Sequence, residues 1–302
     1  MMFDNPVSSW RSLLYVPAHV SKYVDSAIRS GADAVVLDLE DGVPSGAKQD
    51  ARAGIRDAAE KVARAGIDVV VRINRPLGLA VRDIERSVGR FVAALALPKV
   101  ESAEQVRLLA EVITETEAGL GLPSGRTRII TLVETADAWF GMRAIATADA
   151  RVSAMLLGGE DLASQVGMEP SAENLLSLKQ TMIMASAAAR IVPLGLVGSF
   201  ANFRDLDAFR TMVHRSRSLG FQGSTCIHPT QVAILNEVFT PSQAECEEAI
   251  AIVNAFEQSQ SAGFAVAGNG GAMVDLPVAE RARQLIRRHE RIIAKRQERG
   301  FG

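Results

Sequence analysis

The segment IITLVETADAWFGMRAIATADARVSAMLLGGED (129–161) contains the unit from which this chain is built. An apolar, β-branched run at Ile129–Glu134 is followed by a stretch with helix signals and then by a second apolar run at Ala154–Leu157. Two short strands that are connected by a helix run parallel to each other, because the crossover returns the chain to the same end of the sheet. Strands that are apolar throughout indicate a sheet covered on both faces. The segment therefore predicts an α/β fold.

The same unit recurs along the whole chain. A capping-box pattern at Ser102–Gln105, for example, predicts the start of a helix between two of the apolar runs. Eight repeats over about 230 residues favour a TIM-type (β/α)₈ barrel over an open doubly wound sheet, and no GxGxxG fingerprint follows the first strand. The eight predicted strands are Leu13–Val16, Ala34–Asp38, Val69–Ile73, Ala94–Pro98, Ile129–Glu134, Ala154–Leu157, Pro193–Val197 and Gly223–Ile227.

The pattern changes after the eighth predicted strand. Residues 241–258 have the spacing of one further amphipathic helix, and the Ser-, Ala- and Gly-rich stretch 259–271 is typical of a hinge or linker. A terminal helix follows. We therefore predict a barrel domain over 1–258 and a hinged C-terminal segment over 259–302, whose helix closes over the barrel mouth as a lid or packs on another subunit.

Composition narrows the class of protein. The chain has 33 Lys and Arg against 35 Asp and Glu, and this near balance gives no general attraction to nucleic acid or to anionic membranes. No run of eighteen apolar residues and no secretory signal pattern is found in it. The two cysteines, Cys226 and Cys246, have no metal-ligand spacing and fit a reducing compartment. We expect a cytoplasmic protein with no nucleic-acid or membrane partner.

Two carboxylates at the ends of neighbouring predicted strands are the sharpest candidates for chemistry. In TIM barrels the active site lies at the carboxyl ends of the strands. Glu134 ends the fifth strand and Asp161 follows the sixth, so their like charges would repel unless a cation lies between them. Hard oxygens without nearby Cys or paired His suit Mg²⁺, or Mn²⁺, rather than Zn²⁺. The alternative is that both carboxylates only cap the helices that follow.

An arginine inside a hydrophobic strand is the second candidate. Arg72, in VRIN, requires an anionic partner, which is either a structural carboxylate or a substrate oxygen bound by the planar guanidinium. Asp38 ends the second strand, and Glu40 and Asp41 follow it. All three are expected to support the site, by holding Arg72 or a water on the metal. Gly158-Gly159 would let the backbone approach a bound substrate closely, although a simple tight turn also explains it.

Eight short motifs in order along the chain resemble those of the citrate lyase β-subunit and malyl-CoA lyase family, within the HpcH/HpaI aldolase/citrate lyase superfamily. A single such motif would be weak, but the ordered set is highly specific. The motifs are RSLLYVPA (11–18), LDLEDGV (37–43), VRIN (71–74), LPKVES (97–102), ETA (134–136), GGEDL (158–162), IHPTQ (227–231) and MVDLP (273–277).

The resemblance implies roles for residues at the matching positions. Glu134 and Asp161 would coordinate Mg²⁺, and Arg72 would bind the substrate oxygens and stabilise developing negative charge. Tyr15 and Lys22 would contact the CoA part of the substrate. The implied enzyme is a magnesium-dependent lyase that cleaves a malyl-, citramalyl- or citryl-type hydroxyacyl-CoA into an acyl-CoA and a keto acid or glyoxylate, with hydrolysis of the thioester as a further fate.

The resemblance also implies an oligomer. Asp275 matches an acid/base aspartate that family members supply from a neighbouring subunit, which implies a trimer or a hexamer of trimeric units. Two departures concern the substrate: Ser224 stands where many relatives have lysine, and Val197 and Gly198 replace an acidic residue near the seventh strand. Three alternatives therefore stay open: a citrate lyase β-subunit acting on citryl-acyl-carrier protein, a pyruvate-type aldolase that does not use CoA, and a non-catalytic barrel subunit.

Overall fold

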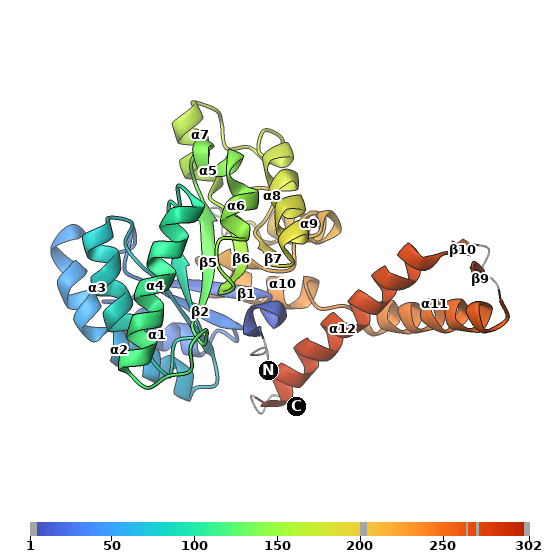
Figure 1. The fold of residues 1–302 in the computed structure, drawn as a ribbon, viewed down its shortest axis with the longest axis horizontal. Helices are drawn as coiled ribbons and strands as arrows, with labels where there is room; N and C mark the ends of the chain where they lie inside the picture. Colours follow the sequence, from blue (N-terminus) through green and yellow to red (C-terminus); the bar gives the residue numbers. More distant parts are fainter. Residues whose placement is uncertain (1–4, 200–203, 264, 270–271, 299–302) are drawn as a thin grey trace. The chain divides into compact units, whose positions relative to one another are not determined.

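The chain consists of two compact units, Met1–Phe239 and Thr240–Gly302. The computed structural model describes residues 5–199, 204–263, 265–269 and 272–298 (Figure 1). The division differs from the expected boundary after residue 258, which falls inside helix α11 (Gln243–Ser261). This helix makes its neighbour contacts with the C-terminal elements that follow it, and so it belongs to the second unit.

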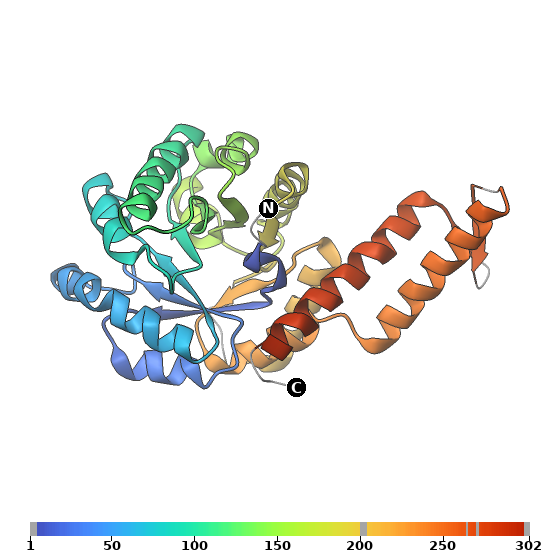
Figure 2. The same ribbon diagram turned by 60° about the horizontal axis from the view of Figure 1, so that its bottom comes forward.

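The first unit is the predicted barrel. Eight parallel strands lie in the order β7-β6-β5-β4-β3-β2-β1-β8, and a bridge between Leu194 and Gly223 joins the two edges. Figure 2 shows these strands enclosed by helices. The prediction of eight strands in a TIM-type barrel is confirmed. The strands are β1 (Ser12–Pro17), β2 (Ala34–Asp38), β3 (Asp68–Arg72), β4 (Ala94–Leu97), β5 (Arg128–Val133), β6 (Val152–Leu157), β7 (Val192–Leu194) and β8 (Ser224–Cys226).

The last two strands are shorter than predicted. The run Pro193–Val197 contributes only its first two residues to β7, because Gly195 leaves extended geometry at φ 140°. The ring of Phe221 lies 3.0 Å from the point where a Cβ on Gly195 would stand. Only glycine fits this turn, which takes the chain out of the sheet at the rim of the barrel.

Helices cover the outside of the barrel. Helix α4 begins as predicted, with the Ser102 hydroxyl accepting a hydrogen bond from the Gln105 N–H at 3.2 Å, although the Gln105 side chain accepts from Glu101 rather than completing a capping box. The helices of the first unit are α1 (Ser21–Ile28), α2 (Lys48–Arg64), α3 (Leu77–Ser87), α4 (Ala103–Gly119), α5 (Ala136–Phe140), α6 (Met142–Ala146), α7 (Gly159–Val166), α8 (Leu176–Ala189), α9 (Leu206–Leu219) and α10 (Pro229–Val238), with short 3₁₀ turns at Pro6–Ser9 and Ser45–Ala47.

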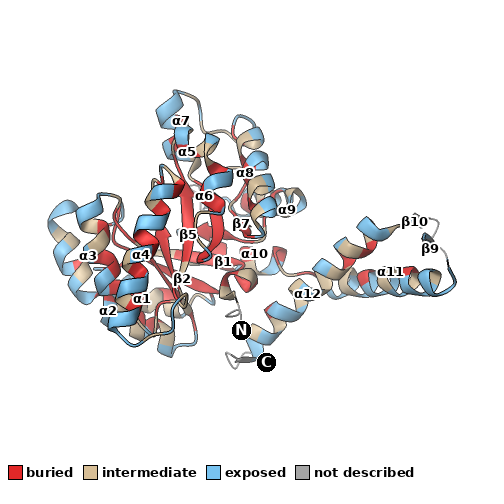
Figure 3. Ribbon diagram, in the orientation of Figure 1, coloured by how far each residue is buried: buried red, intermediate tan, exposed pale blue. Residues whose placement is uncertain are grey.

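The strands separate two apolar layers. Alternate residues such as Leu13 and Val36 point into the barrel, whereas Leu14 and Val35 pack under the helices. Figure 3 shows the strands buried and the outer faces of the helices exposed. The fully buried Trp10 belongs to the inner layer, and its indole N–H donates to Asp68 at the start of β3. The amino end of the barrel is therefore filled by side chains, which leaves the carboxyl end for function.

The second unit is a helical hairpin with a small sheet. After α11, the strands β9 (Ala267–Asn269) and β10 (Ala272–Val274) pair antiparallel, and helix α12 (Leu276–Glu298) follows. Phe256, Val274 and Ala279 form its apolar cluster. The expectation of a plain linker over 259–271 is thus wrong in part, because α11 continues to Ser261 and β9 lies within that stretch.

Within the described ranges, none of the helices combines the length and the apolar character needed to cross a bilayer.

Candidate active site

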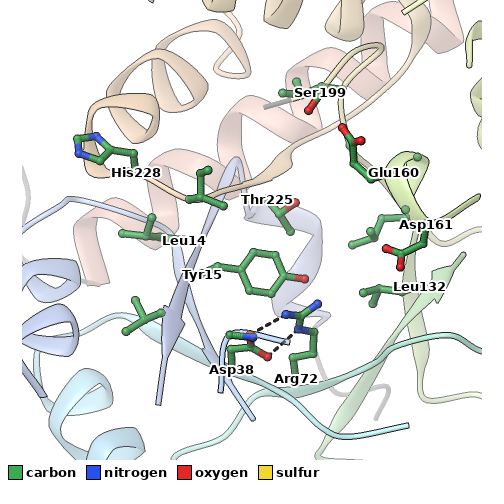
Figure 4. A pocket seen from close by; sticks show the side chains of 18 of the residues that line it. Leu14, Tyr15, Asp38, Arg72, Leu132, Glu160, Asp161, Ser199, Thr225 and His228 are labelled. Atoms are coloured by element: carbon green, nitrogen blue, oxygen red, sulfur yellow. Dashed lines mark hydrogen bonds and ion pairs between the residues drawn. The ribbon is translucent and has the colours of Figure 1, made fainter. Parts of the chain in front are cut away.

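A cavity of about 860 Å³ lies at the carboxyl ends of the barrel strands (Figure 4). Side chains from β1, β2, β3, β5, β6 and β8 line it, together with helix α1, the first turn of α7 and the buried face of α8. All of the lining residues belong to the first unit. Of the predicted site residues, the cavity brings together Tyr15, Asp38, Arg72, Glu134, Gly158, Gly159 and Asp161.

Glu134 and Asp161 interact across this cavity. Glu134 directly follows β5 and is only 6% exposed, and its Oε2 accepts the Lys99 N–H at 2.7 Å. Burial, and next the negative charge of Asp161, raise the pKa of Glu134 to about 7. A Cβ on Gly158 would stand 2.5 Å from the Glu134 Cγ, so only glycine leaves room for this carboxylate. The surrounding backbone therefore fixes Glu134 at a place where the charge of Asp161 acts on it.

This pair fits a divalent cation with oxygen ligands. A cation between the carboxylates would remove the repulsion that raises the pKa of Glu134. In the described part of the chain, no group of three or more His, Cys, Asp or Glu side chains could hold a metal. Mg²⁺ commonly uses only one or two protein carboxylates and fills its remaining positions with water and substrate oxygens.

Arg72 lies at the end of β3 beside three carboxylates. Its Nε and Nη2 donate to the two oxygens of Asp38 at 2.7 and 2.6 Å, and its Nη1 lies 3.0 Å from Glu40. Although burial opposes it, the bonds from Asp38 and the surrounding negative charges raise the pKa of the guanidinium. The exposed Asp41 is more distant, at 3.9 Å. Arg72 is thus a permanently charged cation in a fixed orientation.

Asp38 is itself held by the backbone. Its oxygens accept the N–H groups of Glu40 and Gly42 at 2.9 and 2.8 Å. A Cβ on Gly42 would stand 2.5 Å from one of them. This tight turn after β2 fixes the carboxylate that orients Arg72 (Figure 4).

Lys99 connects the two halves of the site, a role that sequence reasoning missed. Its N–H binds Glu134, and its ammonium lies 2.9 Å from Glu40 and 3.4 Å from Asp41. Its backbone has φ 47°, which is uncommon for a residue with a side chain. The motif LPKVES places Lys99 after β4, but no sequence signal predicts this backbone conformation, which the surrounding contacts enforce.

The two residues expected to contact CoA lie in different environments. The ring of Tyr15, on β1, lines the cavity with the Arg72 guanidinium 4.8 Å from its centroid. Burial raises the pKa of the Tyr15 hydroxyl, which therefore stays protonated. Lys22 is exposed in the first turn of α1, outside the lining, with its ammonium over the Tyr23 ring. Tyr15 thus packs directly against Arg72 within the cavity, whereas Lys22 lies outside its lining.

Asp275 belongs to the second unit. It immediately precedes α12, and its carboxylate accepts the Val278 N–H at 3.2 Å, as a helix N-cap does. This hydrogen bond lies wholly within the second unit.

Sequence reasoning also missed Lys179. It lies on the buried face of α8 and lines the cavity, with its ammonium donating to the carbonyls of Leu196 and Val197 at 2.7 and 3.2 Å. The signal was present in the helical spacing, because Leu175, Lys179 and Met182 recur at the intervals of one face. A lysine on such a face is rare without a specific purpose.

Comparisons with known proteins agree with this geometry. Residues 11–229, more than half of the chain, match the family described as HpcH/HpaI aldolase/citrate lyase. The citrate lyase subunit beta of Leuconostoc mesenteroides is 31% identical over 92% of both chains. The human mitochondrial citramalyl-CoA lyase is 29% identical over 91% of this chain and 84% of its own length.

A solved structure resembles the whole chain. The protein CitE from Mycobacterium tuberculosis, in complex with magnesium, acetoacetate and coenzyme A, has a TM-score of 0.73 and 29% identity over 92% of this chain and 97% of that one. The barrel, the carboxylate pair and the ordered motifs thus agree with the sequence match. The chain belongs to the HpcH/HpaI aldolase/citrate lyase family.

Proposed function

We propose that this chain is a magnesium-dependent lyase that breaks a carbon–carbon bond in a hydroxyacyl-CoA ester, releasing an acyl-CoA and a keto acid or glyoxylate. The observation that carries the proposal is that the carboxylates of Glu134 and Asp161, whose charges interact, line the same cavity as the fixed guanidinium of Arg72. The relatives named as citrate lyase subunit beta and citramalyl-CoA lyase, and the neighbour bound to magnesium and coenzyme A, support it.

Glu134 and Asp161 would hold the metal ion. When bound, Mg²⁺ supplies Lewis-acid polarisation to the hydroxyl-bearing end of the substrate. Glu134 is kept in place for this task by the Lys99 N–H and by the missing side chain at Gly158. The chain would therefore provide a fixed ligand directly after β5 and a more exposed one in α7.

Arg72 would bind substrate oxygens and stabilise developing negative charge. A guanidinium has five N–H donors, of which the hydrogen bonds to Asp38 engage two. Arg72 lines the cavity, and its bonds to Asp38 set its orientation before substrate binds. A donor fixed in this way needs no reorganisation during the reaction.

The proton balance of the reaction needs a base and an acid. The hydroxyl loses its proton, the carbon–carbon bond breaks, and the electron pair passes into the enolate of the thioester, whose carbon then takes a proton. We assign this proton transfer to Asp275 of a neighbouring copy in a trimer or hexamer, in line with the family resemblance. A volume of about 860 Å³ leaves room for the thioester arm beside a four- to six-carbon acyl group.

The test is a turnover assay with Mg²⁺ and malyl-, citramalyl- and citryl-CoA, in which keto acid or glyoxylate and free thiol are measured separately. Lyase activity releases glyoxylate, pyruvate or oxaloacetate without free CoA thiol, whereas hydrolysis releases the thiol. Glu134→Gln and Asp275→Asn should each abolish turnover, while the exposed Gln180→Met should not. If no ester is cleaved and EDTA leaves stability unchanged, the proposal is wrong.

A further inference from the structure

Lys179 is the buried cation of the cavity that the proposed reaction does not use. The residue is 5% exposed, and two of the three N–H bonds of its ammonium go to the neutral carbonyls of Leu196 and Val197. These carbonyls lie just beyond β7, where the chain turns out of the sheet. The ammonium is therefore held at the cavity wall, with one N–H left for a ligand.

The surroundings of Lys179 contrast with those of Arg72. Arg72 has two carboxylates within 3.0 Å, so its charge is compensated by the protein. No carboxylate of the described residues forms an ion pair with Lys179, although the charge of Glu160 acts on it from a distance. A buried charge without a counter-ion is unfavourable, and burial accordingly lowers the pKa of Lys179 to about 8. A bound anion would supply the missing partner.

The first turn of α7 carries Asp161 of the proposed metal pair and, next to it, Glu160. The charge of Asp161 acts on Glu134, and that of the adjacent Glu160 acts on Lys179. All four residues line one cavity, and Figure 4 shows Glu160 and Asp161 on the same side of it, across from His228. Because Lys179 is buried, only a compact part of a ligand can reach it, which excludes the bulky diphosphate of CoA.

We propose that Lys179 binds a second carboxylate on the acyl part of the substrate, and thereby selects dicarboxylic acyl groups of the citryl type over monocarboxylic ones. This inference rests on the proposed function and assigns its substrate class. Citramalyl and citryl groups differ at one position, where citryl carries a carboxymethyl in place of a methyl. A neutral wall would favour the methyl, whereas an unpaired ammonium favours the carboxylate.

The test compares citryl-CoA with citramalyl-CoA in the Mg²⁺-loaded protein. We expect wild type to prefer citryl-CoA. In Lys179→Met, kcat/KM for citryl-CoA should fall about 10- to 100-fold, mostly through KM, with less than about a threefold change for citramalyl-CoA. Lys179→Arg, which keeps the charge, should recover part of the preference. Gln180→Met, at the exposed neighbouring position of α8, is the matched control. Equal losses on both esters, or no loss on either, would overturn the inference.

Binding of the keto-acid products separates this inference from the proposed function. Oxaloacetate differs from pyruvate by one carboxylate. In calorimetry with Mg²⁺, Lys179→Met should therefore weaken the binding of oxaloacetate and leave the binding of pyruvate unchanged. That result supports the inference even if no ester is cleaved, in which case the proposed function fails by itself. Equal effects on both acids contradict the inference. If Lys179→Met does not fold, Lys179→Gln, which retains a donor for the two carbonyls, takes its place.

Discussion

Replacing Glu134 with glutamine should stabilise the metal-free protein at pH 8. In the folded chain the pKa of Glu134 is raised from 4.5 to about 7, first by burial and then by the charge of Asp161. Between these two values the folded state holds a proton that the unfolded state has released. Stability therefore falls as pH rises from 4.5 to 7, and the loss remains complete above 7.

The magnitude follows from the width of that window. A shift of about 2.5 pKa units at about 1.4 kcal/mol per unit gives a destabilisation of about 3 kcal/mol at pH 8, and well under half of that at pH 5. Glutamine has no charge to bury, and its amide oxygen can still accept the Lys99 N–H. The variant should therefore be more stable than wild type by about 3 kcal/mol in EDTA at pH 8.

The assay is urea unfolding of wild type and Glu134→Gln in EDTA at pH 5, 6, 7 and 8. Other groups titrate over this range, but they are common to both proteins and cancel in the difference. Adding Mg²⁺ at pH 8 should stabilise wild type and leave the variant unchanged, because metal binding requires the ionised carboxylate. A stability difference that does not vary with pH would refute the claim that burial and Asp161 perturb this group. A magnesium effect of equal size in both proteins would refute its role as a ligand.

Three further predictions test other parts of the structure. Gly158→Ala places a Cβ against Glu134 and should weaken Mg²⁺ binding about 10- to 100-fold, as measured by calorimetry. Gly54→Ala, at a position with open space around it, should leave Mg²⁺ binding unchanged. Equal Mg²⁺ affinities in the two variants would contradict the tight packing at Gly158. Arg72→Lys should lower kcat/KM about 100-fold, because lysine cannot reproduce the paired donors of the guanidinium, and it should leave Mg²⁺ affinity unchanged. Near-wild-type activity of this variant would exclude a role of Arg72 in charge stabilisation. Trp10→Phe removes a hydrogen bond at the amino end of the barrel and should lower the free energy of unfolding by about 1–2 kcal/mol, with activity in the folded protein unchanged.

The sequence by itself determined the elements and the positions of most charged groups. Eight apolar runs predict eight strands because parallel strands covered on both faces must be apolar throughout, and the pattern is local to each strand. Glu134 and Asp161 were identifiable for the same reason, since each stands at the end of such a run. Their meeting in one cavity needed only the rule that parallel strands end at the same edge of a barrel.

Only the tertiary structure decided which side chains meet and in which state. The contacts of Lys99 depend on a left-handed backbone conformation that no local pattern encodes, and those of Lys179 depend on where β7 ends relative to α8. The helix α11 carries a strong capping sequence, but its assignment to the second unit follows from its contacts with α12. Such contacts join residues far apart in sequence, and their energies depend on burial and on the distances between charges. The apolar runs along the chain determine the strands, and packing in three dimensions determines the chemistry at their ends.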